Sequence, residues 1–455
     1  MKVLLIIPSI TDFAAHDMWA APYGMMVIAS ALKKHNIEFD ILDLLGRNYT
    51  RKEYEDGRRR YKRTIIEMPK ILRNKNIKRH YAIYGANFDD IEAEVEKLTN
   101  TYKLIVMSTT MTYWYYGYKY IYERLKNRFQ TSTFAIGGVY VTLLESHSKT
   151  VFEGAHIFPN QRLQYFDKLV SEIYGKEFTC FSQPFSLWEF PDVESFSHRR
   201  YIPALLMRGC PFNCTYCASK TLVKNLEHKD PIKLADWVIQ TCETTGIDNV
   251  ALFDDAFLYR ADEFAKPFLR RIMQSNLRLR LHASNGLHPR FIDEELASLM
   301  RKSGFETIRL SLESSDEKIM SITGDKVKRT EYENAIKYLQ KSGYKKAELG
   351  TYIICGIPHQ SPQEVIDSIK YVDDIGGVVY LAEYSPIPNT PLFYESIKIS
   401  RYDLHEPLWQ NNTLMSYWNP SFNEEVLNKL KNFLIGLRKD VDKADDDLQK
   451  SKTSK

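Results

Sequence analysis

The chain has 455 residues, of which 44% are hydrophobic and 26% charged, and its net charge is +4. This length leaves room for two or three domains, and the composition is typical of a soluble globular protein. The charge is too small to indicate a nucleic-acid partner, and no apolar stretch approaches the roughly 18 residues of a membrane span. Residues 2–7 are too short for a signal peptide and run into Pro8, so we expect a cytoplasmic protein.

Residues 1–180 alternate expected strands and helices. Continuous apolar runs predict strands at residues 2–7, 38–42, 104–107 and 133–136, with helices at residues 22–34 and up to Arg128. Buried strands separated by helices are typical of a parallel sheet covered on both faces. We therefore expect an α/β, doubly wound domain of the Rossmann or flavodoxin type, with ligands at the carboxyl ends of its strands.

A basic segment interrupts this domain between Arg58 and Arg79, where ten Lys or Arg residues accompany a single acid, Glu67. Such a charge run predicts a solvated, partly helical face. The alternative is a basic lid or docking surface for an acidic or peptide partner. Further along, residues 181–200 contain aromatic residues and prolines without helical periodicity, which predicts a connector.

Residues 201–400 repeat a strand-helix unit. The expected strands cover residues 202–207, 249–253, 279–283, 307–312, 349–354 and 378–384. Six such units predict a partial (β/α)6 barrel of the TIM type, with catalytic residues at the carboxyl ends of the strands. Residues 401–455 predict a helical C-terminal extension with a charged tail.

Local signals mark the ends of the helices in this barrel. Helix starts are expected at Asp230-Pro231, at Thr330 with Glu333, and at Ser361 with Glu364. Gly304 and Gly343 stand where glycines end helices.

Three of the six cysteines, Cys210, Cys214 and Cys217, stand within eight residues directly after the first barrel strand. Gly209 and Pro211 exclude regular secondary structure, so the thiols lie on a loop that can wrap one object. Thiolates bind iron or zinc, but structural zinc requires four ligands, and no fourth Cys or His stands nearby. A 4Fe-4S cluster held by three thiolates keeps one iron open.

The pattern Cys-x-x-x-Cys-x-aromatic-Cys, with Tyr216 as the aromatic residue, resembles the signature of the radical S-adenosylmethionine (SAM) superfamily. This resemblance implies that the three cysteines hold a 4Fe-4S cluster whose open iron takes SAM. Reductive cleavage of SAM would release a 5′-deoxyadenosyl radical, with an electron from a donor such as flavodoxin or ferredoxin. The expected partners are therefore SAM, an electron donor and a small-molecule or peptide substrate that the sequence does not identify.

The resemblance also implies cofactor-binding positions at the ends of later strands. Asp254 and Asp255 are expected near the SAM amino group, although Asp255 would alternatively cap a turn. Glu313 matches the Glu-Ser element that relatives place near the SAM ribose and carboxylate. The expected cofactor-binding residues are Tyr216, Asp254, Asp255, Ser284, Asn285, Glu313, Ser314, Gly356 and Pro386.

Two positions depart from the pattern of these relatives. His359 stands where relatives usually have the second glycine of Gly-x-Pro-Gly, so the sequence leaves the usual backbone turn open. Asn389 stands where glycine is common in a Pro-x-Pro-Gly-Thr segment, and Asn tolerates the left-handed backbone that such a turn needs. The lone Cys355 near this rim is expected to be packed in the core.

Over roughly residues 1–410 the chain resembles radical SAM proteins with a cobalamin-binding domain, notably at residues 21–24, 41–43, 111–115 and 136–140. In that class, methyl transfer to an unactivated carbon is a frequent outcome. The Asp-x-His-x-x-Gly loop that supplies histidine to cobalt is absent, since His16 has neither its spacing nor its glycine. Cobalamin would therefore bind without a protein histidine, or not at all. Residues 111–118, rich in Tyr, predict either core packing or a flat wall over a corrin or substrate.

Three functions remain open from the sequence. The first is a radical SAM enzyme that performs cobalamin-dependent methylation of an unactivated carbon. The second is a radical SAM oxidoreductase or a rearrangement or coupling enzyme without cobalamin. A methylthiotransferase is disfavoured, because no cysteine precedes Cys180. The third is a zinc-binding non-enzyme in which the thiols only stabilise the fold.

Overall fold

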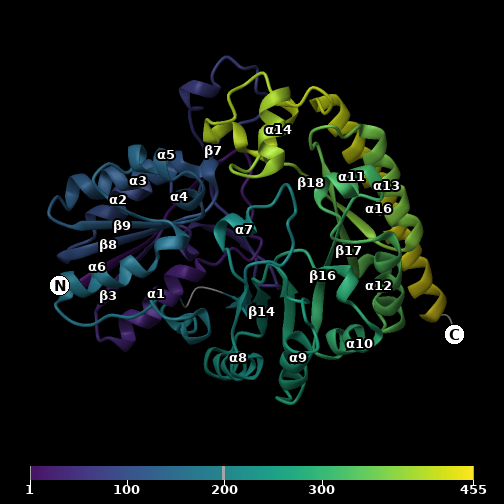
Figure 1. Ribbon diagram of the computed structural model, residues 1–455, viewed down its shortest axis with the longest axis horizontal. Coiled ribbons are helices and arrows are strands. Elements are labelled where there is room, and N and C mark those ends of the chain that lie inside the picture. Colours follow the sequence, from purple (N-terminus) through teal and green to yellow (C-terminus); the bar gives the residue numbers. More distant parts are fainter. Residues whose placement is uncertain (1, 197–199, 454–455) are drawn as a thin grey trace.

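The computed structural model describes residues 2–196 and 200–453, with side chains up to Arg438. Residues 197–199 of the predicted connector, residues 454–455 of the predicted tail and Met1 lie outside the described part. Figure 1 shows two groups of strands side by side, the N-terminal one in purple and blue and the second in teal and green. The boundaries expected near residues 180, 200 and 400 stay predictions.

The first sheet has five parallel strands in the order β10-β9-β8-β1-β3. These strands are β1 (Lys2–Ile7), β3 (Phe39–Asp43), β8 (Tyr102–Thr109), β9 (Thr133–Gly138) and β10 (His156–Phe158). Numbered along the chain, the order is the 2-1-3-4-5 of a flavodoxin-like sheet, which confirms the predicted doubly wound fold. The order changes direction between β1 and β8, where such sheets open a crevice.

Helices cover both faces of this sheet. Leu5 of β1 belongs to the core with α1 (Tyr23–Lys34) and α6 (Gln164–Tyr174). Its neighbour Leu4 points to the other face, toward α2 (Phe88–Glu96) and α3 (Tyr115–Arg128). This alternation explains why the strand is a continuous apolar run. Two short helices, α4 (Val139–Leu143) and α5 (Glu145–Val151), follow β9.

The basic segment between residues 58 and 79 contains two short strands and a 3-10 helix (Lys70–Leu72), and most of its side chains are exposed. The predicted solvated face is therefore confirmed, and its helical part is limited to this one turn. The two strands of the segment are β5 (Arg59–Tyr61) and β6 (Arg63–Ile65). The neighbouring strands outside the segment are β2 (Ile10–Asp12), β4 (Thr50–Glu53) and β7 (Ala82–Tyr84). β5 pairs with β4, and β6 pairs with β7, so backbone pairing outweighs the local charge pattern. Arg59 is the buried exception among these basic residues: it is 2% exposed, and its guanidinium lies 3.3 Å from the Asp17 carboxylate.

The second sheet has six parallel strands in the order β11-β14-β15-β16-β17-β18, which confirms the partial barrel. They are β11 (Ile202–Ala204), β14 (Asn249–Leu252), β15 (Arg280–Ala283), β16 (Phe305–Glu313), β17 (Leu349–Cys355) and β18 (Val378–Glu383). The helices around it include α8 (Pro231–Thr245), α9 (Ala265–Met273), α10 (Glu294–Lys302), α12 (Arg329–Lys341) and α13 (Pro362–Ile375). The expected first strand is interrupted after β11 and resumes as β12 (Met207–Arg208), which pairs with β13 (Glu227–His228).

Two of the three predicted helix starts are confirmed. The Asp230 carboxylate caps α8, and Ser361 forms a capping box with Glu364. The start expected at Thr330 is wrong, because α12 begins at Arg329. Glu331 accepts a hydrogen bond from the Lys328 amide at 2.7 Å. Glu331, and not the expected Glu333, therefore satisfies the free N–H at the start of this helix.

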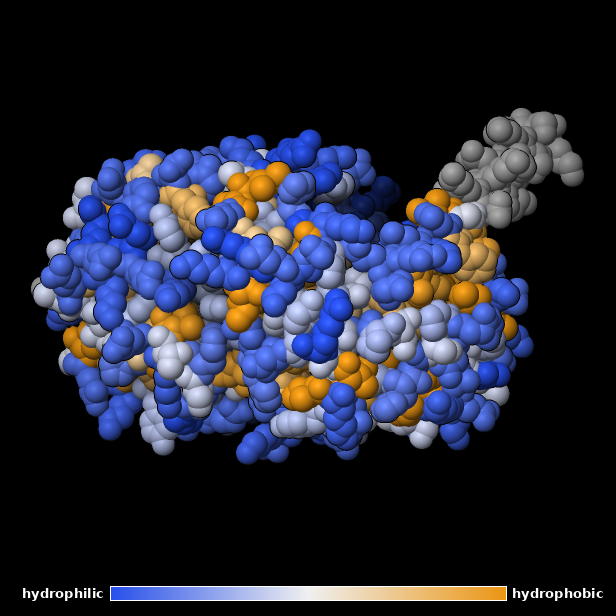
Figure 2. Space-filling model, turned by 90° about the horizontal axis from the view of Figure 1, so that it is seen from above, coloured by the Kyte–Doolittle hydropathy of each residue, from blue (hydrophilic) through white to orange (hydrophobic). Residues whose placement is uncertain are grey.

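The C-terminal part covers the top and outer side of the barrel. α14 (Pro391–Ile399) lies at the top of Figure 1, and α16 (Glu424–Thr453) runs beside α12 and α13 as the expected helical extension. Within the described residues, no helix combines the length and apolar character needed to cross a membrane. Seen from above, hydrophobic residues form small patches separated by hydrophilic ones (Figure 2).

Candidate functional site

The three clustered cysteines lie on the loop between β12 and the short helix α7 (Ser219–Leu222), which sits between the two sheets in Figure 1. Gly209 opens this loop with a φ of +87°, a conformation that side chains disfavour. All three thiols are free and partly exposed, whereas Cys180, Cys242 and Cys355 are buried. The three thiols lie on one loop and are close enough that Cys214 and Cys217 add to the rise that burial causes in the pKa of Cys210. The expected packing of Cys355 in the core is confirmed.

Polar residues after β14 and β15 hold the start of this loop. The buried Asp254 carboxylate accepts hydrogen bonds from the amides of Leu206 (3.2 Å) and Met207 (2.6 Å). Burial raises the pKa of Asp254 to about 8. Ser284 and Asn285 donate to carbonyls at the end of β14 and just beyond it. These contacts give the three residues a structural task, and their expected contact with SAM stays a prediction.

Asp255 and Ser219 lie beside the thiols. The Ser219 amide and hydroxyl are 3.4 and 3.2 Å from the Cys217 sulfur, and Ser219 also bonds to the Asp255 carboxylate. Burial raises the pKa of the Cys210 thiol to about 11, and the nearby charge of Asp255 adds to the effect. Hydrogen bonds to sulfur orient thiolate ligands and tune a bound metal.

A buried ion pair adjoins the same loop. The Lys326 ammonium lies 2.5 Å from the Glu313 carboxylate and 2.8 Å from the Tyr216 hydroxyl, and both charged side chains are 9% exposed. Burial alone would lower the pKa of Lys326, but the charges of Glu313 and the thiols of Cys214 and Cys217 outweigh it and raise the pKa. The structure thus brings Glu313 and Tyr216 together, and their expected contact with SAM stays a prediction.

Lys326 is a residue that the sequence did not reveal. It follows α11 (Glu317–Thr323) by three positions, on a loop that begins with Gly324. A Cβ on Gly324 would lie 3.3 Å from the Cys214 Cα, so this loop packs directly against the cysteine loop. A glycine and a lysine after a helix are too common to mark a site, which is why no local signal pointed here.

Three other expected cofactor residues contact protein rather than open space. The Ser314 hydroxyl lies 3.2 Å from that of Ser368 on α13. A Cβ on Gly356 would come within 2.5 Å of the Met415 side chain, so this glycine allows the C-terminal segment to approach. Pro386 is buried. Their roles in cofactor binding stay predictions.

At both positions where this chain replaces the glycine of relatives, the backbone is left-handed. His359 has a φ of +68° and Asn389 a φ of +67°, so each adopts the left-handed conformation that favours glycine. The following helix α14 reaches the cysteine loop, because the Leu392 amide donates to the Thr215 carbonyl at 3.0 Å. The chain therefore keeps a left-handed residue at His359, where the sequence left the usual backbone turn open.

A cavity of about 200 Å³ lies at the carboxyl ends of β8 and β9, between α1 and α6; we call it the apolar slot. Its lining includes Met25, Ile28, Ala135, Phe158, Phe166 and Trp188. Gly137 and Gly138 form part of the wall and project no side chain into it. Leu205 and Arg208, next to the cysteine loop, complete the lining, so the slot connects the two halves of the molecule.

The aromatic residues 111–118 do not form this lining. Trp114 donates to the Asp12 carboxylate at 2.5 Å, and the Tyr115 hydroxyl donates to Glu406 at 3.1 Å. Tyr118 is buried in the core beneath β8. The segment therefore connects the end of β8 with the C-terminal part, and the flat wall over a corrin or substrate stays a prediction.

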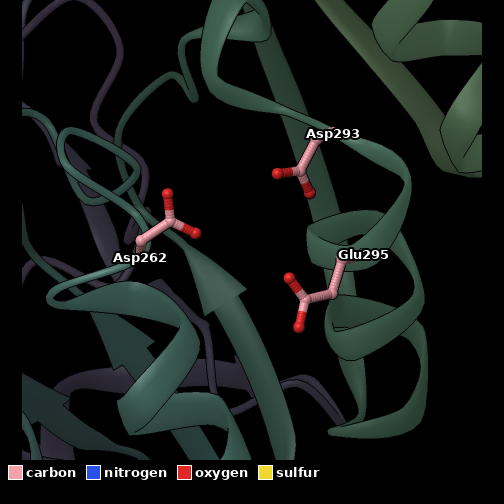
Figure 3. Close-up of side chains that lie close together, drawn as sticks. All are labelled: Asp262, Asp293 and Glu295. Atoms are coloured by element: carbon pink, nitrogen blue, oxygen red, sulfur yellow. The ribbon is translucent and has the colours of Figure 1, made fainter.

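One group of carboxylates elsewhere resembles a metal site. Figure 3 shows Asp262 facing Asp293 and Glu295 across a gap near the start of α10. The Lys266 ammonium lies 2.7, 2.7 and 2.9 Å from these three carboxylates, so a protein cation already occupies the centre. This cluster is an ion-pair network that joins α9 to α10.

Comparison with known proteins defines the class of this site. Residues 205–372 match the radical SAM superfamily, so the chain contains a radical SAM domain. An uncharacterized methyltransferase of Pyrococcus horikoshii is 26% identical over 231 residues, which cover 50% of this chain and 46% of the relative. An anaerobic magnesium-protoporphyrin IX monomethyl ester cyclase of Synechocystis sp. is 24% identical over 133 residues, or 29% and 26% of the two chains. The chain thus spans about half, or less, of these curated relatives.

Solved structures extend the likeness to both sheets. The radical SAM methyltransferase TsrM of Kitasatospora setae, solved with cobalamin and a [4Fe-4S] cluster, matches with a TM-score of 0.62 at 14% identity, over 88% of this chain and 78% of that one. The cobalamin-dependent radical SAM enzyme OxsB matches with a TM-score of 0.56 at 11% identity, over 93% and 57%. The chain therefore has the fold of cobalamin-dependent radical SAM enzymes.

Proposed function

We propose that this protein is a radical SAM enzyme in which Cys210, Cys214 and Cys217 hold a 4Fe-4S cluster and SAM binds the open iron. The observation that carries the proposal is the set of three free, partly exposed thiols on one loop of a radical SAM domain. When bound, the cluster would supply the electron that breaks a carbon–sulfur bond of SAM and releases a 5′-deoxyadenosyl radical.

The chain's own residues prepare this site. Ser219 would donate to the Cys217 thiolate, and the Lys326 ammonium would offset the negative charge of the thiolates. Lys326 and Glu313 also present one charge of each sign beside the loop, which suits the carboxylate and the ammonium of SAM. Asp254 fixes the backbone from which the loop starts.

We further propose that cobalamin binds at the carboxyl edge of the first sheet. The apolar slot has a volume of about 200 Å³ and is lined mainly by apolar side chains, so it would take the flat aromatic base of cobalamin while the larger corrin would stay outside it. Gly137 and Gly138 let a ligand approach the backbone closely. When bound, cobalamin would supply a methyl group for transfer to an unactivated carbon. His16 is exposed and outside the slot, so this proposal includes no histidine ligand from that loop.

The second candidate is a radical SAM oxidoreductase or coupling enzyme without cobalamin. The missing Asp-x-His-x-x-Gly loop favours it. In that case the apolar slot would hold part of the substrate or remain a packing defect. Either candidate would take electrons from a flavodoxin or ferredoxin and work in the cytoplasm, where a reducing environment preserves free thiols.

Anaerobic reconstitution tests the proposal. The reconstituted protein should contain about four irons per chain and should form 5′-deoxyadenosine from SAM and a strong reductant. Incubation with hydroxocobalamin and removal of the excess should leave a cobalamin spectrum on the protein. If the protein holds the cluster and cleaves SAM but retains no cobalamin, the second candidate is supported. One zinc and no iron would reject both and leave a zinc-stabilised non-enzyme.

A further inference from the structure

The inner face of β16 carries polar residues that point into the barrel. Ile308, Leu310 and Leu312 face the surrounding helices and are at most 2% exposed. The alternating residues Thr307 and Arg309 are partly exposed, although they lie on a central strand. Since neighbouring residues of a strand point to opposite faces, the barrel interior is accessible at the level of Arg309.

Arg309 is a guanidinium without a counter-ion. It lies 4.0 Å from the centre of the Tyr380 ring, and its Nη1 donates to the Ile308 carbonyl at 2.8 Å. In the described part of the chain, no carboxylate lies within ion-pair distance of it. A Cβ on Gly350 would come within 2.7 Å of Nη1, so the missing side chain creates the room for this arrangement.

Three other basic side chains in or beside the barrel are either paired with an acid or neutral. The Arg58 guanidinium, which reaches in from the basic segment, pairs with Asp56 at 2.7 Å. Burial lowers the pKa of His282 to about 4, so its imidazole is neutral at physiological pH. Further up the barrel, Lys326 pairs with Glu313. Arg309 therefore gives this part of the interior a net positive charge, and a half-buried guanidinium offers several free donors to a carboxylate.

The position of Arg309 relates this charge to the proposed SAM site. Ser311 stands two residues further along the same face, about 7 Å away. Glu313 follows a register shift in the strand, so it lies at most about 13 Å away. A Cβ on Gly286 would overlap the Ser311 hydroxyl and lie 3.4 Å from the Tyr352 ring. The loop after β15 that is expected to face SAM thus contacts the residues directly above Arg309. Tyr352 and Tyr380, with ring centres 6.3 Å apart, provide an aromatic wall between the two levels.

We propose that Arg309 binds a carboxylate of the substrate, so that the enzyme acts on a small organic acid whose apolar part lies against Tyr352 and Tyr380. The inference rests on the proposed function, because it takes the SAM end of the barrel as the place of reaction. The planar guanidinium of Arg309 offers paired N–H donors that match a carboxylate, whereas the Arg438 guanidinium beside the same Tyr380 ring is exposed. The reacting carbon would lie about 7–13 Å from the carboxylate, the span from Arg309 to Ser311 and Glu313.

Fractionated cell extract tests the chemical class. Extract is separated on an anion exchanger, and each fraction is added to reconstituted enzyme with SAM and reductant while 5′-deoxyadenosine is measured. The stimulating compound should bind the exchanger at neutral pH and lose its charge below about pH 3, where carboxylic acids are protonated. Stimulation by a neutral compound, by one still anionic at that pH, or by no fraction overturns the proposal. If the reconstituted enzyme forms no 5′-deoxyadenosine from SAM and reductant, with or without added extract, the proposed function itself is overturned.

Variants then assign the contact to Arg309. With the stimulating fraction, Arg309→Gln should raise the concentration for half-maximal stimulation about tenfold to a hundredfold, as expected for loss of a charged hydrogen bond. Arg309→Lys should recover part of the effect, and SAM binding should stay unchanged in both. The matched control is Arg438→Gln, which removes a guanidinium 4.8 Å from the same Tyr380 ring but from an exposed position. Equal behaviour of Arg309→Gln and Arg438→Gln, or weakened SAM binding in Arg309→Gln, overturns the assignment.

Discussion

The barrel and the first sheet offer two kinds of site. In the barrel, ligand atoms are concentrated, with three thiols, an ion pair and hydrogen bonds to sulfur around one loop. At the first sheet, the apolar slot is a cavity with few polar atoms in its lining. The lining residues come from strands and helices that are far apart in the chain. A metal is held by the identity of a few donors, whereas a flat apolar group is held by the volume left between many side chains. We therefore expect one substitution of a thiol to abolish the barrel site. The apolar slot should instead be lost when a larger side chain fills its volume.

Cys214→Ala should produce the largest effect on the barrel. Two thiolates cannot replace the three-ligand set, so iron content should fall to background and 5′-deoxyadenosine formation by at least about a thousandfold. Iron analysis and product quantification after reconstitution check this. Cys242→Ala, which removes a buried thiol on α8, is the matched control and should keep both. Retained iron in the Cys214 variant would reject the cluster assignment.

Separating Lys326 from Glu313 should reveal whether the ion pair serves stability or binding. Lys326→Met leaves the Glu313 carboxylate buried without its partner, and should lower the free energy of unfolding by about 3 kcal/mol. The double variant Lys326→Met with Glu313→Gln removes both charges and should regain most of that stability. If the pair contacts SAM, the double variant should still bind SAM at least about tenfold more weakly. Denaturant unfolding and SAM titration together check this, and normal SAM affinity in the double variant would reduce the pair to a structural role.

The same contrast explains what the sequence could predict. Both sheets were predictable, because buried parallel strands are continuous apolar runs with helices between them. The cysteine loop was predictable because its ligands are close in sequence. Lys326 was not, because it is joined to Glu313 and Tyr216 only by the packing of Gly324 on the loop. The strands of the basic segment were hidden as well, because their pairing partners β4 and β7 lie outside it.

Filling the apolar slot should abolish cobalamin binding at the first sheet and leave SAM cleavage in the barrel intact. Gly137→Leu places a side chain in the slot, and a Cβ there meets only the Phe158 carbonyl at 3.4 Å, so the backbone need not shift. Cobalamin retention should fall at least about tenfold, as expected for lost contact in an apolar pocket, while SAM cleavage stays unchanged. Gly137→Ala is the graded control and should retain more cobalamin than the leucine variant. Equal retention in both variants would place cobalamin elsewhere.

The smallest expected effect concerns a contact between the two regions. Asn389, on the turn after β18, has a φ of +67°, and its side-chain amide donates to the Leu143 carbonyl on α4 at 2.9 Å. Asn389→Ala loses both the tolerance of the left-handed backbone and the hydrogen bond, so it should cost about 1–2 kcal/mol of unfolding free energy. Asn389→Gly keeps the backbone conformation and loses only the hydrogen bond, so it should cost less. Urea unfolding of the two variants separates the contribution of the backbone conformation from that of the hydrogen bond. If the glycine variant is as unstable as the alanine variant, the contact between the regions matters more than the turn, and the two sites depend on a shared interface.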